Sequence, residues 1–173
     1  MSPSWPRVLK LHELGAGPLR INLEASADDR EAIGRQLGLE SLAALTAEIA
    51  ASPWFDGVEI TGSFRADVEQ ICGVTLEPFC QEVSGDILVR VVPSSSPHAP
   101  LHEGGDLEMD SAAPDAPDIL VNDAIDVSGY VVEHLALELD PFPRKLGATF
   151  EFEAPSAELS PFSALQSLRE PKG

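Results

Sequence analysis

Residues 118–147 read DILVNDAIDVSGYVVEHLALELDPFPRKLG, and this stretch decides how the rest of the chain can fold. The apolar run Ile119–Val121 is typical of a short strand. Asp126 is a candidate helix cap, because its carboxylate can accept a hydrogen bond from a free backbone N–H of the first turn. Apolar side chains then recur at helical spacing as far as Leu135, which predicts one amphipathic helix over about 126–139.

The predicted helix is followed by the segment Asp140–Lys145, with the sequence DPFPRK. A residue that precedes proline disfavours the helical conformation, so the helix should end at Asp140. The two prolines restrict the backbone and hold Phe142 and the basic pair Arg144-Lys145 in an extended arm. Two interpretations stay open: either Phe142 plugs the core, or the arm contacts RNA phosphate or an acidic partner surface. The predicted partner-binding residues are Asp123, Asp126, Asp140, Pro141, Phe142, Pro143, Arg144 and Lys145.

Strand patterns dominate the first half of the chain. Residues 57–71 alternate strictly between apolar and polar side chains, which predicts an antiparallel strand with one dry and one wet face. A second strand is expected from Val83 to Val92, after an interruption at Leu76–Phe79, and it should be central or covered because both its faces are largely apolar. Residues 19–24 also alternate, and residues 8–11 are expected to pair with them around a turn at 15–18.

Residues 39–51 fit two patterns, because their Ala-rich composition favours a helix while their position just before a predicted antiparallel partner favours a strand. We take the strand. Short helices are predicted near 27–37, after a Ser26 cap, and near 161–168, after Ser160-Pro161. The fold class is therefore α+β: an antiparallel β-meander or partly closed sheet, packed by the main helix. We expect one domain over 1–173, with a mobile, acidic, proline-rich loop at about 93–117.

The charge of the chain limits its partners. The net charge is −18, and residues 93–140 contain 11 acidic residues and neither lysine nor arginine. Most of such a surface repels phosphate backbones, so a basic protein is the expected electrostatic partner, and DNA is not. The sequence has no apolar run of transmembrane length and no signal-peptide pattern, which predicts a cytoplasmic protein without a membrane partner.

Residue chemistry alone predicts no catalytic, metal or cofactor site. Cys72 and Cys80 are eight residues apart, whereas paired zinc ligands are usually two to four apart. His98 and His102 are separated by prolines that prevent a regular helix, and the acidic residues from Asp106 onward do not match a calcium-binding loop. No nucleophile turn or glycine-rich phosphate loop is present.

Two blocks together resemble one family. The first runs from Gly62 through Cys72 to Pro78, and the second runs from Asp123 through Leu137 and ends with the arm Asp140–Lys145. Over roughly residues 10–170 the chain is similar to the YceD-like, large ribosomal RNA subunit accumulation family, in its alphaproteobacterial form. The family pattern places a second cysteine where this chain has Thr75. Many relatives also have a later cysteine pair near 141–147, which this chain lacks.

The resemblance implies a non-enzymatic factor that supports accumulation or processing of large-subunit (23S) ribosomal RNA. The expected partner is a basic large-subunit ribosomal protein or a pre-ribosomal particle. One alternative is direct binding of ribosomal RNA through Arg144-Lys145, and another is a thiol enzyme that uses Cys72.

Overall fold

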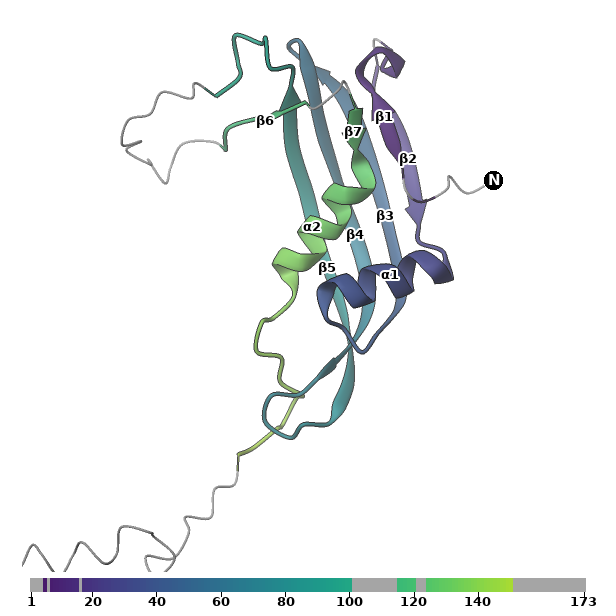
Figure 1. The fold of residues 1–173 in the computed structure, drawn as a ribbon, viewed down its shortest axis with the longest axis vertical. Helices are drawn as coiled ribbons and strands as arrows, with labels where there is room; N and C mark the ends of the chain where they lie inside the picture. Colours follow the sequence, from purple (N-terminus) through teal and green to yellow (C-terminus); the bar gives the residue numbers. More distant parts are fainter. Residues whose placement is uncertain (1–4, 6, 16, 101–114, 121–123, 151–173) are drawn as a thin grey trace, which may run out of the picture.

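The computed structural model describes residue 5 and residues 7–15, 17–100, 115–120 and 124–150. Five strands form one sheet in the order β2-β3-β4-β5-β6, and two helices lie over the same face of it (Figure 1). The strands are β2 (Leu19–Glu24), β3 (Ser41–Trp54), β4 (Gly57–Ile71), β5 (Pro78–Val92) and β6 (Asp118–Ile119). All neighbours pair antiparallel except β5 and β6. The predicted α+β class is confirmed, and residues 41–54 form a strand rather than a helix.

The alternating pattern of β4 builds the centre of the core. Its even-numbered apolar side chains, among them Ile60, Phe64 and Val68, are almost completely buried. Helix α2 (Val127–Glu138) packs mainly over β5 and also touches β4, with one stripe of side chains of which Val131 and Leu135 are fully buried. The odd-numbered side chains of β4 point to the opposite face of the sheet, because side chains alternate along a strand.

The first and last residues of both helices are set by capping and helix-ending residues that are recognisable in the sequence. Helix α1 (Ala27–Leu37) begins at a capping box between Ser26 and Asp29 and ends at Gly38, whose φ of 68° is left-handed. Helix α2 begins at Asp126, whose carboxylate accepts a hydrogen bond of 2.9 Å from the Gly129 N–H. It ends at Glu138, just before the Asp140-Pro141 pair.

The expected pairing of residues 8–11 with β2 is wrong. Strand β1 (Val8–Lys10) pairs instead with β7 (Ala124–Asp126), which leads directly into α2, and η1 (Leu11–Glu13) is a short 3-10 helix. The pair buries Leu9 and Ile125 completely or almost completely against the core. Burial of these two side chains stabilises the β1–β7 pair.

Strand β5 also differs from its prediction. It begins at Pro78 rather than Val83, because Leu76 adopts a left-handed conformation (φ 58°) that closes the hairpin within a few residues. Proline is acceptable as the first residue of a strand. Beyond β4, the only described strand that pairs with β5 is the two-residue β6. Helix α2 packs on one face of β5, and on the other face Leu88 is 61% exposed. The expectation of a central or covered strand therefore holds in part: β5 lies between β4 and the short β6, but only one of its faces is covered.

The predicted acidic loop and C-terminal helix lie partly or wholly outside the described residues. The start of the acidic loop is packed, since the Ser96 hydroxyl donates to Asp56 at 2.7 Å and the His98 ring stacks on Phe55. Residues 101–114 and the predicted helix at 161–168 lie outside the described residues. Within the described part of the chain, no helix has the length and apolar character needed to cross a membrane.

Candidate functional site

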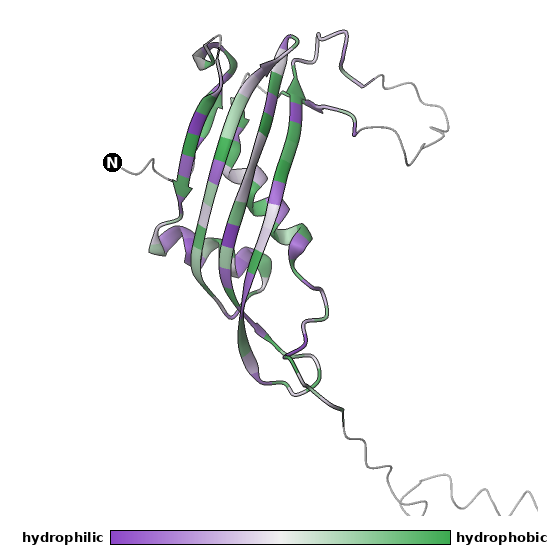
Figure 2. Cartoon of the chain, turned by 180° about the vertical axis from the view of Figure 1, so that it is seen from behind, coloured by the Kyte–Doolittle hydropathy of each residue, from purple (hydrophilic) through white to green (hydrophobic). Residues whose placement is uncertain are grey.

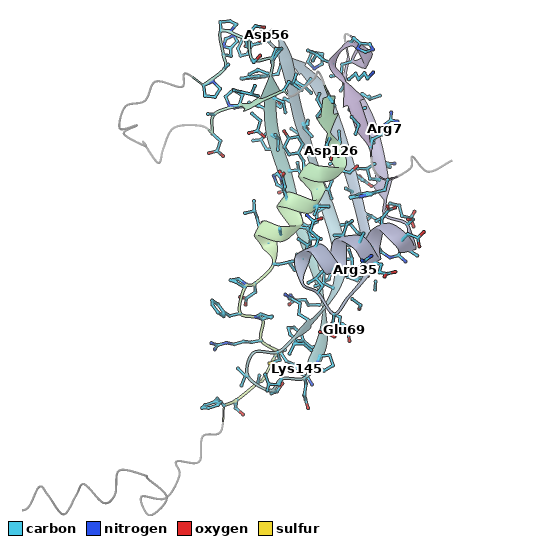
Figure 3. The ribbon with its side chains drawn as sticks, viewed as in Figure 1. Arg7, Arg35, Asp56, Glu69, Asp126 and Lys145 are labelled. Carbon is cyan, nitrogen blue, oxygen red and sulfur yellow. The ribbon has the colours of Figure 1, made fainter. Side chains whose placement is uncertain are left out.

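The β4–β5 hairpin extends past both helices, and the chain returns to it after α2 (Figure 1). We call residues Cys72–Glu77 the hairpin tip and residues Asp140–Gly147 the strap. Figure 3 shows Lys145 of the strap at this far end of the molecule, well away from Asp126. The two segments are about 70 residues apart in the sequence, and the fold places them in contact.

Three contacts fasten the strap to the tip. The Gly73 N–H donates to the Pro143 carbonyl at 2.9 Å, and the Lys145 N–H donates to Cys72 Sγ at 3.4 Å. The Lys145 ammonium also pairs with the Glu77 carboxylate at 3.2 Å. The strap is therefore attached through both backbone and side chain, at residues that frame the Cys72 turn.

Cys72 is the centre of this junction. Its side chain is fully buried, and its Sγ accepts backbone N–H groups from Val74 and Thr75, each at 3.4 Å, besides that of Lys145. Hydrogen bonding from the Thr75 side chain, followed by these N–H groups, lowers the pKa of the Cys72 thiol from 9.0 to about 6, although burial opposes the shift. These donors therefore favour the thiolate form of Cys72, and a negative charge on Sγ strengthens the hydrogen bond from the strap.

We predict that the Cys72 thiol titrates near pH 6. Thiolate absorbance near 240 nm should follow one transition with that midpoint in a Cys80→Ser background, which removes the exposed second cysteine. The Thr75→Val substitution should raise the midpoint, because it removes the largest cause of the shift. A midpoint close to 9 in both proteins would contradict the hydrogen-bonded thiolate.

The lowered pKa of Cys72 also predicts how the free energy of unfolding changes with pH. Between about pH 6 and pH 9 the folded protein carries the thiolate while the unfolded chain keeps the proton. The unfolded state therefore binds more protons in this window, and the contribution of Cys72 to stability grows as pH rises. It is lost as pH falls through 6, and a Cys72→Ser protein should lack this dependence.

The tip does not fit a zinc ion. Zinc in a structural site needs four ligands, usually thiolates and imidazoles, and Cys72 is the single cysteine at this junction. Its sulfur is already surrounded by backbone N–H donors. No group of three or more candidate ligands exists among the residues that the structure describes. The backbone N–H donors around Cys72 hold this junction through protein groups.

The strap presents apolar side chains to solvent instead of burying them. Phe142 is 76% exposed and Leu146 is completely exposed, and Leu76 of the tip is 76% exposed. The interpretation that Phe142 plugs the core is therefore wrong. Exposed apolar side chains that gather at one end of a protein are typical of a contact surface.

The structure divides the predicted site residues. Asp140 to Lys145 lie together on the strap, whereas Asp126 caps α2 elsewhere and Asp123 lies outside the described residues. One charge of the basic pair is neutralised, because Lys145 forms an ion pair with Glu77. The Arg144 side chain is exposed. Prediction from the sequence missed the role of Glu77 and the anchoring of the strap by Cys72. The Cys-x-x-Thr spacing was the available signal, since N–H groups two and three residues after a cysteine can turn back onto its sulfur.

Comparison with known protein families shows to which family the chain belongs. A model of the family described as large ribosomal RNA subunit accumulation protein YceD matches residues 60–169, which is more than half of the chain. The chain belongs to this family. The matched range contains most of β4 and all of β5, α2, the tip and the strap. The YceD family is named for a role in accumulation of the large ribosomal RNA, and its description names no enzymatic activity. No curated protein and no solved structure matches the chain.

Proposed function

We propose that this YceD-family protein is a non-enzymatic, cytoplasmic factor in ribosome biogenesis that binds a basic protein of the large subunit, free or within a precursor particle. The net charge of −18 carries this proposal. Proteins with such a charge attract basic partners over a Debye length of about 10 Å at 0.1 M salt. Ribosomal proteins that bind RNA are basic, and an acidic factor suits them before they meet RNA.

The strap supports a protein partner over bare RNA. A phosphate-binding surface needs several uncompensated cations, because each neutralised phosphate adds to affinity. Here Glu77 already neutralises Lys145, and the remaining described ion pairs engage Arg35, Arg65 and Arg90. Cys72 adds nothing to a thiol-enzyme interpretation, since its sulfur is buried and no substrate can reach it in this conformation.

The test offers the immobilised protein two separate pools from purified large subunits, one of their proteins and one of their RNA. We expect basic proteins to bind at ~0.05 M salt and to be released by ~0.5 M salt, as screened charges require. The RNA should pass through. An Arg144→Glu protein should retain the same ribosomal proteins within about twofold, because exposed single charges contribute little.

The alternative gives a different result. If the wild type retains ribosomal RNA and Arg144→Glu abolishes that binding, the protein binds RNA directly through the strap. Retention of neither pool at low salt would contradict the proposed function. As a control for function in cells, depletion of the protein should lower the ratio of large-subunit to small-subunit ribosomal RNA.

A further inference from the structure

The five-stranded sheet has one unpartnered face. Helices α1 and α2 cover one side, and Figure 2 looks onto the other side, over which no described helix or strand lies. Hydrophilic and hydrophobic residues alternate along these strands, as expected for a sheet with one wet face (Figure 2). This open face is formed by the outward side chains of β2, β3, β4 and β5.

The open face is hollowed at its centre. A hollow of about 970 Å³ is lined by residues of β2 to β5 and by none of α1 or α2, so it lies on the open side. Small outward side chains, those of Thr46, Ser63 and Ser84, contribute to its floor, and Arg65 lies between Thr46 and Ser84 in the strand register. Glu48 and Asp86 stand on either side of Ser63 in the strand register, and both belong to the lining.

The charge of this face is one-sided. By strand register and alternation it carries seven acidic residues and three arginines. Two of the arginines are already used: Arg90 pairs with Glu59 at 2.9 Å and lies over the Trp54 ring, and Arg65 pairs with Glu82 at 3.6 Å. Among the described residues, no side-chain hydrogen bond or ion pair engages the carboxylates of Glu24, Glu48 and Asp86, which line the hollow.

We infer that the open face of the sheet binds an extended segment of the basic ribosomal protein, with its arginine or lysine side chains in the hollow between Glu24, Glu48 and Asp86. This inference rests on the proposed function and names the surface that performs it. Charge complementarity selects the occupant, because uncompensated carboxylates around a small-residue floor leave space and charge for long cationic side chains.

The dimensions of the face suit such a segment. Neighbouring strands are about 4.7–4.9 Å apart, which places Glu48 and Asp86 about 10 Å apart across β4. Cationic side chains of an extended chain can therefore reach the two carboxylates separately. Leu88 follows Asp86 on the same face and is 61% exposed, so it can contact the aliphatic stem of an arginine or lysine.

The experiment compares three immobilised variants with the wild type, using the total proteins extracted from purified large ribosomal subunits as the probe. The first is Glu24→Gln, Glu48→Gln, Asp86→Asn, which neutralises the hollow. The matched control is Asp115→Asn, Glu133→Gln, Glu138→Gln, which makes the same change in net charge at exposed positions outside the open face. The third is Ser63→Arg, which places a cation inside the hollow. Unchanged thermal unfolding is required of each variant.

Retention by the hollow variant should fall about tenfold or more, as expected when three exposed charge pairs are lost together. Ser63→Arg should show a similar loss, and the matched control should stay within about twofold of the wild type. Equal retention by the wild type and the hollow variant would show that the open face is not the binding surface, and it would leave the proposed function intact. An equal loss in the control would also overturn it, because net charge would then suffice. No retention by the wild type would contradict the proposed function itself.

Discussion

Replacing Leu135 by alanine should lower the free energy of unfolding by about 2–5 kcal/mol. The Leu135 side chain is completely buried where α2 packs on the sheet. Alanine removes its contacts and leaves a cavity that the long strands of the sheet cannot fully close. Because α2 leads into the strap, the same substitution should also loosen the attachment of the strap to the hairpin tip.

Leu137 is a matched control on the same helix. It has the same side chain two residues later, but it is 80% exposed. Leu137→Ala should change the unfolding free energy by no more than about 0.5 kcal/mol. Urea unfolding followed by circular dichroism measures both. Equal effects of the two substitutions would mean that α2 does not present the described face to the sheet.

Local patterns predicted the elements well because their causes are local. The alternation in 57–71 reports directly which side chains of β4 are buried, and Ser26 with Asp29 marks the start of α1 through hydrogen bonds within one turn. Asp126 and the Asp140-Pro141 pair define α2 in the same way. The strand conformation within residues 39–51 depends on pairing with the antiparallel neighbour β4 rather than on composition. This tertiary pairing outweighs the helical preference of alanine.

Long-range contacts had no comparable signal. Strand β1 pairs with β7 at positions such as Leu9 and Ile125, which are more than a hundred residues apart and look like ordinary apolar residues in the sequence. The strap was recognised as a separate segment, but its attachment to Cys72 depends on a turn that only the folded hairpin forms.

The hollow of the open face was invisible for a related reason. Glu48, Ser63 and Asp86 come from three strands, and each alone is a normal polar residue on a wet strand face. The strand register places these three residues side by side in one row across the sheet. A wet face was predicted correctly, but sequence alone could not show that its centre combines small side chains with unpaired carboxylates.

Gly62 should tolerate no side chain, and this can be tested against a second glycine. A Cβ on Gly62 would lie 2.2 Å from the Glu48 carbonyl oxygen and 3.0 Å from Ile49 Cα, both backbone atoms of the paired strand β3. Neither can move without separating β3 from β4. Gly62→Ala should therefore lower the unfolding free energy by about 3 kcal/mol or more, at the upper end of what overpacking costs.

Gly34 in α1 gives the opposite expectation. A Cβ there would approach Leu42 Cβ at 3.8 Å, which is ordinary contact. Gly34→Ala should raise stability by about 0.5–1 kcal/mol, because alanine favours the helix and restricts the unfolded chain. Both variants can be measured by urea unfolding in parallel. Since Gly62 precedes Ser63 at the floor of the hollow, loss of stability in Gly62→Ala should be accompanied by loss of ribosomal-protein binding, whereas Gly34→Ala should bind as the wild type does. A Gly62→Ala protein as stable as the wild type would contradict the close approach of β3 and β4 at this position.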